Sequence, residues 1–189
     1  MSSTLRGVLL GAAGTLLVLL VIALLVILTG AYNVAATERH TALGEWALQT
    51  TYVNSVQGQA DDIVVPELTL AMVAAGAPEY KAMCAHCHGG VGESRAEWAQ
   101  GMRPMPPALA HAAKKWSAAE IHWLVTHGVK MSGMPAFGPT HDEQAIWNIA
   151  AFVKALPGMS EDQYAAYGSA HGGGAEGHSH AGGTAAPAE

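Results

Sequence analysis

The stretch Cys84-Ala85-His86-Cys87-His88 decides how this chain of 189 residues is interpreted. On a helix, Cys84 and Cys87 are three residues apart and His88 is four residues from Cys84, so all three side chains project from one side. Two sulfurs placed in this way reach the two vinyl groups of one porphyrin, while the imidazole reaches its iron. The spacing is that of covalent c-type haem attachment. It predicts one haem c, bound through Cys84 and Cys87 with His88 as an axial ligand, and His86 facing solvent.

Two other kinds of site use paired cysteines. A thioredoxin-like site needs a βαβ context, and no stretch of this chain alternates convincingly like a strand. A zinc site needs further ligands at close spacing, and the surrounding segment holds no second CxxC and no HxxxH pair. The chain has only two cysteines, so the haem interpretation leaves neither a disulfide nor a free thiol.

The second axial ligand has to come from the opposite face of the ring, and therefore from distant sequence. Met134 is followed by Pro135, which biases Met134 away from the helical region and stiffens the loop. A stiff loop holds a thioether against iron with little reorganisation, which makes Met134 the first candidate. Met131, one helical turn earlier, is the alternative. Met102 and Met105 are expected to pack at the haem edge, since methionine fills irregular apolar gaps.

The other histidines and the tryptophans of this segment have ordinary structural interpretations. The histidines are expected at the surface or at helix ends, and the tryptophans in the core or against the haem. They are His111, His122, His127 and His141, and Trp98, Trp116, Trp123 and Trp147.

Residues 77–159 are predicted to form an all-α haem domain of three or more helices. The first helix is expected to begin at Pro78, because proline suits the opening position. The second has the capping-box spacing of Ser117 and Glu120 and stops at Gly128. The last is expected to be capped by Thr140 and to end at 157–158. The long segment between the first two helices is expected to wrap the haem.

Three features of these residues resemble class I monohaem cytochrome c. They are Tyr80-x-x-x-Cys84-x-x-Cys87-His88, the proline-rich loop after it, and Gly133-Met134-Pro135-Ala136-Phe137 before a last helix that contains Trp147. The resemblance covers residues 77 to 158 and implies a small cytochrome c fold around one covalent haem, with His88 and Met134 on the iron. It also implies that the first and last helices cross, with Tyr80 or Met83 against Trp147 or Ile146.

The N-terminal segment predicts a membrane anchor within residues 1–36. From Gly7 to Thr37 there is no charged residue, and Val8 to Thr29 is an apolar run long enough to cross a bilayer. Arg6 precedes the run, so the N-terminus is expected in the cytoplasm and the haem domain in the periplasm, on the inner membrane. The alternative is a cleaved signal peptide, with the small residues 34–36 at the cleavage site.

The remaining two segments show little that indicates chemistry. Residues 37–76 are interpreted as a juxtamembrane spacer, with a short helix to about Val56 whose face carries Leu43 and Trp46. Residues 160–189, rich in Gly, Ala and His, are predicted to be a disordered tail. Its histidines, His171, His178 and His180, are interpreted either as a loose metal site or as part of a solvated linker.

The charge of the chain bears on its partners. The net charge of −6, without a basic stripe, argues against nucleic acid. All 15 acidic residues and eight of the nine Lys and Arg follow residue 37, so the region outside the membrane is acidic and suits a partner with a basic face.

The function expected from these features is one-electron transport, not catalysis, in a bacterial respiratory chain. Expected redox partners are a terminal oxidase, a quinol-oxidising complex or a dehydrogenase, with the membrane bound through the N-terminal helix. Three alternatives stay open. They are a subunit of a larger respiratory oxidoreductase complex, a haem sensor or enzyme in which Met134 dissociates, and a metal-handling protein that uses the histidine-rich tail.

Overall fold

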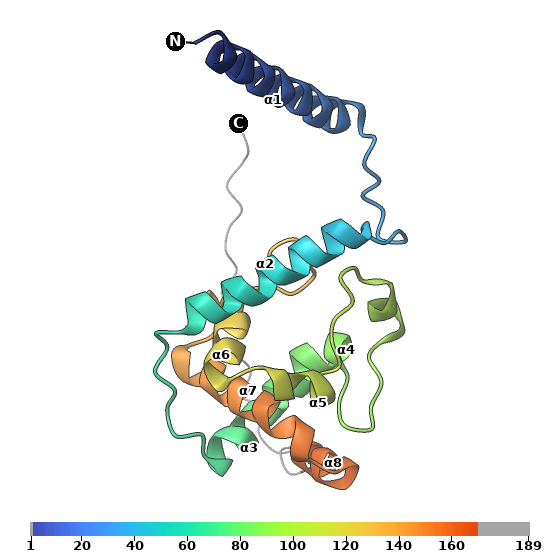
Figure 1. Cartoon of the computed structure of the whole chain (residues 1–189). Helices are drawn as coiled ribbons and strands as arrows, with labels where there is room; N and C mark the ends of the chain where they lie inside the picture. Colours follow the sequence, from blue (N-terminus) through green and yellow to red (C-terminus); the bar gives the residue numbers. More distant parts are fainter. Residues whose placement is uncertain (1, 170–189) are drawn as a thin grey trace, which may run out of the picture. The chain divides into compact units, whose positions relative to one another are not determined.

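The computed structural model describes residues 2–169, and over this range every regular element is a helix (Figure 1). The predicted all-α class is therefore confirmed. The chain divides into two compact units, one ending at Thr41 and the other beginning at Ala42.

The first unit contains one long apolar helix, α1 (Ser3–Thr29). Its start is capped by Ser2, whose side chain accepts a hydrogen bond from the Leu5 backbone N–H at 3.3 Å. It ends at Gly30, which has φ +65°, a conformation that glycine adopts without strain. The 27 residues are long and apolar enough to cross a membrane, and none of them is buried.

The second unit begins with α2 (Ala42–Ala60), which is longer than the predicted helix to Val56. The second half of α2 packs against α6 (Ala118–His127). Tyr52 meets Trp116 edge-on with ring centroids 5.5 Å apart, and Val56 and Ala60 are buried. Part of the segment predicted as a spacer thus packs on the haem domain, because Tyr52, Val56 and Ala60 recur every four residues on one helical face.

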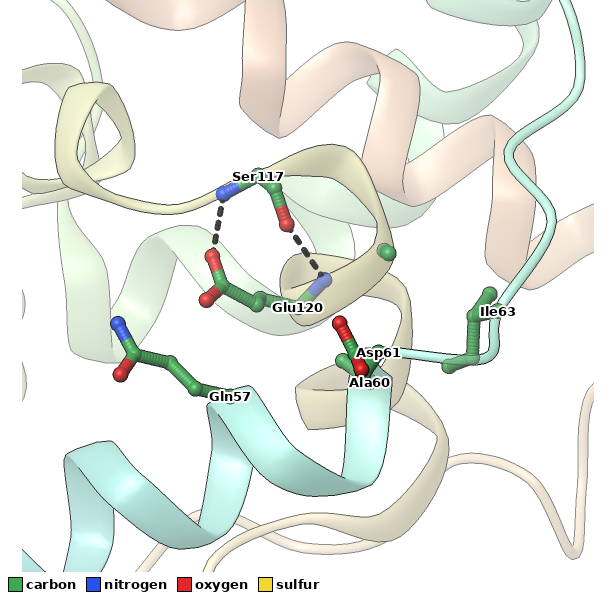
Figure 2. Close-up of a pocket in the computed structure, with 7 residues that line it drawn as sticks. Gln57, Ala60, Asp61, Ile63, Ser117 and Glu120 are labelled. Atoms are coloured by element: carbon green, nitrogen blue, oxygen red, sulfur yellow. Dashed lines mark hydrogen bonds between the residues drawn. The ribbon is translucent and has the colours of Figure 1, made fainter.

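The contact between α2 and α6 leaves a small hollow of about 190 Å³ (Figure 2). On one side lies the end of α2, and on the other the start of α6, where the predicted capping box is confirmed. The Glu120 N–H donates to Ser117 Oγ at 3.2 Å, and the Ser117 N–H donates to the Glu120 carboxylate at 2.6 Å. As predicted, α6 stops at Gly128.

The helix before the CxxCH segment is α3 (Leu70–Glu79), so the predicted start at Pro78 is wrong. The helix begins earlier because Thr69 caps it, accepting a hydrogen bond from the Met72 N–H at 3.2 Å. Pro78 lies inside α3, close to its end, and the expected boundary between residues 76 and 77 falls within this helix. A π-helical turn, η1 (Tyr80–Cys84), and a short helix, α4 (Ala85–His88), follow directly.

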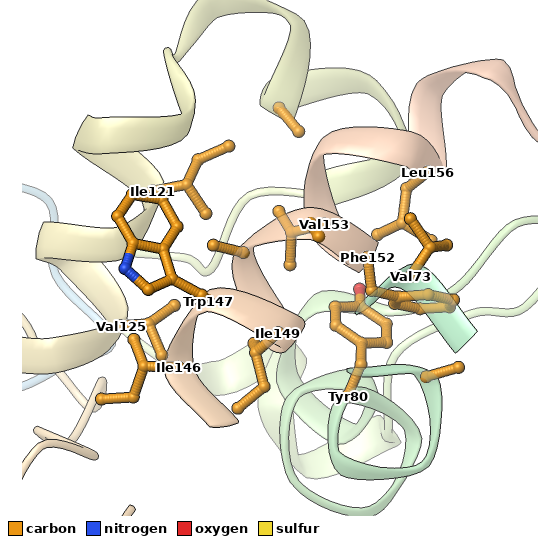
Figure 3. Close-up of a cluster of buried hydrophobic side chains, with 14 of the residues drawn as sticks. Val73, Tyr80, Ile121, Val125, Ile146, Trp147, Ile149, Phe152, Val153 and Leu156 are labelled. Atoms are coloured by element: carbon orange, nitrogen blue, oxygen red, sulfur yellow. The ribbon is translucent and has the colours of Figure 1, made fainter. Parts of the chain in front are cut away.

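The core is built around α7 (Glu143–Ala155), which packs against both α3 and α6 (Figure 3). The predicted Thr140 cap is wrong, because Asp142 accepts the Ala145 N–H at 2.8 Å and starts the helix two residues later. At the crossing of α3 and α7, a Cβ on Gly76 would lie 2.0 Å from the Asn148 carbonyl oxygen.

The crossing of these helices pairs different aromatic residues from those expected. The Tyr80 ring packs on Phe152, with centroids 5.2 Å apart, whereas Trp147 faces Ile121 and Val125 of α6 (Figure 3). Gly76 sets this register, because it lets α3 approach α7 closely at Asn148. Tyr80 is one helical turn after Gly76 and Phe152 is one turn after Asn148, so the two rings come side by side.

The chain after α7 corrects the prediction for the tail. Residues 161–169 form a helix, α8 (Glu161–Ser169), and its Tyr164 is only 1% exposed. The cause is long-range packing, because the Tyr164 ring lies against Gly90 and Phe152. The histidines at 171, 178 and 180 lie outside the described residues. The remaining short helices are η2 (Glu97–Gly101), α5 (Leu109–Ala112), η3 (Ala113–Lys115) and η4 (Leu156–Gly158).

Candidate haem site

The two cysteines and His88 lie on one continuous helical segment. Cys84 ends the π-helical turn η1 and is followed by α4, which holds Cys87 and His88, so the three residues lie within five consecutive helical positions. Both cysteines are half-buried and form no disulfide with each other, whereas His86 is exposed, as expected. The π turn before them is of the kind that occurs most often at functional sites.

The surroundings of the Cys84 thiol favour its neutral form. Burial, and then the neighbouring Cys87, raise its pKa to about 12. Reactive cysteines instead have a depressed pKa beside cationic groups or a helix N-terminus. No group of three or more His, Cys, Asp or Glu that would hold a metal ion occurs in residues 2–169. A buried, neutral thiol differs from the activated cysteine of a thioredoxin-like site.

The His88 imidazole is oriented by a backbone carbonyl from another part of the chain. Its Nδ1 lies 2.8 Å from the Pro107 oxygen, so Nδ1 carries the proton and Nε2 is left with a free lone pair. Burial lowers the pKa of His88, which favours the neutral imidazole that binds iron. A ligating histidine whose other nitrogen is hydrogen-bonded in this way is typical of metal sites. The residues present thus fit a haem iron at Nε2.

The loop that presents the Pro107 carbonyl is attached to the haem-binding segment. The Arg95 guanidinium donates to the adjacent Pro106 carbonyl. The Ala96 N–H donates to the His86 carbonyl at 2.8 Å. Because both bonds tie the loop to nearby elements, the acceptor of the His88 proton is held in place. Nothing in the local sequence pairs His88 with a residue 19 positions away, so this contact was not predicted.

The loop that carries Met134 is bonded to the end of α6. The Val129 N–H donates to the Met134 carbonyl at 3.2 Å, and the Met134 N–H donates to Ser132 Oγ at 3.1 Å. Gly128, with φ +64°, allows the close approach, since a Cβ there would lie 2.7 Å from the Met134 oxygen. These contacts restrain the loop that carries Met134, as expected from Pro135.

The four methionines considered as ligands or haem-edge residues differ in exposure. Met134 and Met102 are half-buried, whereas Met131 is 86% exposed and Met105 is 51% exposed. Met102 packs on the Met134 loop, because a Cβ on Gly133 would lie 2.1 Å from the Met102 methyl group. The proline-rich loop and the methionine loop therefore meet, although about 30 residues separate them.

One histidine is not where the sequence indicated. His122 was expected at the surface or at a helix end, but it is 6% exposed between α6 and α7. Its ring stacks on Trp147 with centroids 4.0 Å apart, and its Nε2 lies 3.1 Å from Glu143 Oε1. Trp147 Nε1 donates to that oxygen at 3.0 Å. Burial lowers the pKa of His122, while Glu143 opposes the shift.

The other candidate histidines and aromatic residues play ordinary roles. His111 and His127 are exposed, and His127 stands in the last turn of α6, as expected. His141 packs edge-on against Phe137 in the methionine loop. Trp147 is in the core as predicted, whereas Trp98 is 63% exposed and lies outside it.

The comparisons with known proteins bear on this segment. Residues 71–153 match the model of a family described as cytochrome C oxidase, cbb3-type, subunit III. The match begins in α3 and ends in α7, so it contains Cys84, Cys87, His88 and Met134. No curated protein and no solved structure matches the chain.

Proposed function

Because residues 71–153 form a c-type cytochrome domain, we propose that the chain is a membrane-tethered, one-electron carrier with His88 and Met134 as the axial ligands of a single haem c. When bound, the haem supplies an iron that alternates between the ferrous and ferric states. Cys84 and Cys87 would hold it covalently. A methionine ligand favours the ferrous state and so raises the reduction potential.

The contact between His88 Nδ1 and the Pro107 carbonyl carries this proposal. It fixes the tautomer and the ring plane of the imidazole, and it directs Nε2 away from the loop. Met134 is the matching candidate on a second, separately restrained loop. If His88 and Met134 both bound the iron, they would leave no open site for oxygen or a substrate, as electron transfer without catalysis requires.

The location proposed for the carrier rests on α1 and on charge. The 27 apolar residues of α1 would anchor the chain in the inner membrane. Arg6 before the helix favours a cytoplasmic N-terminus and a periplasmic haem domain. A tether raises the effective concentration of the haem domain near membrane-bound redox partners. Partners of that kind are a terminal oxidase, a quinol-oxidising complex or a dehydrogenase of a respiratory chain. The basic surface of such a partner would bind the acidic haem domain.

A second candidate function is that of a fixed subunit in an oxidase complex. The observation that favours it is the description of the matching family as an oxidase subunit. In this case the chain would deliver electrons within the complex and would not diffuse. Purification in mild detergent separates the two functions, since a free carrier elutes alone whereas a subunit elutes with stoichiometric partners.

The ligand assignment is tested by replacing the two methionines of one loop. Met134→Ala is expected to remove the weak far-red absorption band of a sulfur–iron bond, to lower the reduction potential, and to let ferrous iron bind carbon monoxide. Met131→Ala, at the exposed position, is the matched control and is expected to change none of these. If the two variants behave the other way round, Met131 is the ligand. Carbon monoxide binding by the unmodified protein would instead favour a sensor or an enzyme.

A further inference from the structure

The first half of α2 presents apolar side chains that nothing in the described part of the chain covers. Leu43 is 73% exposed and Trp46 is 64% exposed, and their three-residue spacing makes them neighbours on the helix surface. The buried residues of α2, Val56 and Ala60, are both in its second half, close to where Tyr52 packs on Trp116. The start of α2 therefore extends beyond the contact that its second half makes with α6.

The chemistry of this surface suits the boundary between lipid headgroups and acyl chains. Glu45 is the only charged residue of α2, which has no lysine or arginine. A surface of this kind is not drawn to anionic headgroups, and its affinity for a membrane would come from apolar burial. Tryptophan is enriched at this boundary, where one end of its ring system is apolar and the indole N–H remains hydrated.

The length of the connecting chain keeps this surface close to a membrane. α1 ends at Thr29 and α2 begins at Ala42, so residues 30–41 alone connect them. Fully extended, these twelve residues span at most about 40 Å. If α1 crosses a bilayer, the first turns of α2 cannot move further from its surface than that.

We propose that the start of α2 docks on the lipid bilayer, inserting Leu43 and Trp46 at the headgroup boundary. The proposal rests on the membrane anchor of the proposed function. α2 would be a second attachment point, and because its other half packs on α6, the haem domain would be held in one range of orientations toward the membrane. A partner in the same membrane would then meet a fixed face of the domain.

The test uses the full, haem-loaded chain in phosphatidylcholine vesicles that carry brominated acyl chains, which quench tryptophans at the lipid boundary. Trp46→Phe is expected to lose most of the bromine-dependent quenching. Trp98→Phe is the matched control, because Trp98 is 63% exposed against 64% for Trp46, and it is expected to retain the quenching. Adding phosphatidylserine is expected to change neither result, since the contact is apolar.

A second pair of variants tests the contact without removing a fluorophore. Leu43→Glu is expected to abolish most of the quenching of Trp46, whereas Leu70→Glu, at a position 82% exposed in the same unit, leaves it intact. A carbonate wash of the vesicles reports the anchor separately. If the chain washes off, the anchor fails and this proposal fails with it. If the chain stays but Trp46 is not quenched, or is quenched only with anionic lipid, the docking proposal alone is overturned.

Discussion

Two buried tyrosines are expected to lose different amounts of stability when the phenol oxygen is removed. Tyr80 is fully buried, and its hydroxyl donates to the Gly89 carbonyl at 2.6 Å, next to His88, the proposed axial ligand. Tyr164 is 1% exposed, and its hydroxyl makes no hydrogen bond of good geometry within the described residues, although burial and then the nearby Glu93 carboxylate raise its pKa. Each phenylalanine variant keeps the ring and its packing. The difference between them therefore compares a well-formed buried hydrogen bond with a poorly aligned one.

The expected change in unfolding free energy depends on which hydrogen-bonding groups each variant leaves without a partner. Tyr80→Phe leaves the Gly89 carbonyl without that donor, and an unsatisfied buried group of this kind costs about 1–3 kcal/mol. Tyr164→Phe removes a hydroxyl that has only the poorly aligned Glu93 carboxylate beside it, so its cost is expected to be smaller than that of Tyr80→Phe. With a slope of about 4 kcal/mol per molar guanidinium, a loss of 2 kcal/mol lowers the unfolding midpoint by about 0.5 M.

Guanidinium unfolding of the full chain in detergent, followed by haem absorbance and tryptophan emission, measures both variants. Tyr167→Phe, at a partly exposed position in α8, is the control and is expected to leave the midpoint unchanged. The reasoning is refuted if Tyr80→Phe matches this control, or if Tyr164→Phe loses as much stability as Tyr80→Phe. A slope that differs among the variants would instead indicate an altered unfolded state.

Three further predictions concern the packing of the helices. Gly76→Ala places a methyl group 2.0 Å from the backbone at Asn148 and is expected to cost about 1–3 kcal/mol or more and to lower haem content, whereas Gly58→Ala, with open space around it, leaves the thermal midpoint nearly unchanged. Because the pKa of buried His122 lies below its ordinary 6.5, the contribution of His122 to the unfolding free energy is expected to be constant above pH 6.5 and to fall below it, where the unfolded chain takes up the proton first. In urea unfolding measured at several pH values, His122→Gln should reduce the loss of unfolding free energy below pH 6.5. If the variant loses as much as the unmodified protein, other groups cause the loss. Lys154→Met removes donors to two backbone carbonyls, at 2.5 and 3.4 Å, and is expected to cost about 1–3 kcal/mol by chemical unfolding; no change would mean that these carbonyls find other donors.

Features that depend on spacing within one or two helical turns were predictable from the sequence. The arrangement of Cys84, Cys87 and His88 follows from the periodicity of a helix. The ends of α6, at Ser117 and Gly128, follow from local capping chemistry. The apolar run of α1 follows from composition alone. Each of these is decided by neighbours along the chain, and so a single sequence is enough to identify it.

Other features depend on contacts between distant segments, and only the tertiary structure decided them. The partner of His88 is a carbonyl 19 residues away, and the burial of Tyr164 depends on Gly90. Local composition favoured a tail over α8 and a surface position for His122, because both features arise from surfaces that meet only in the folded chain. The sequence by itself predicted which residues would hold the haem. The fold determined which groups orient and restrain them, since that depends on how loops far apart in the sequence come together.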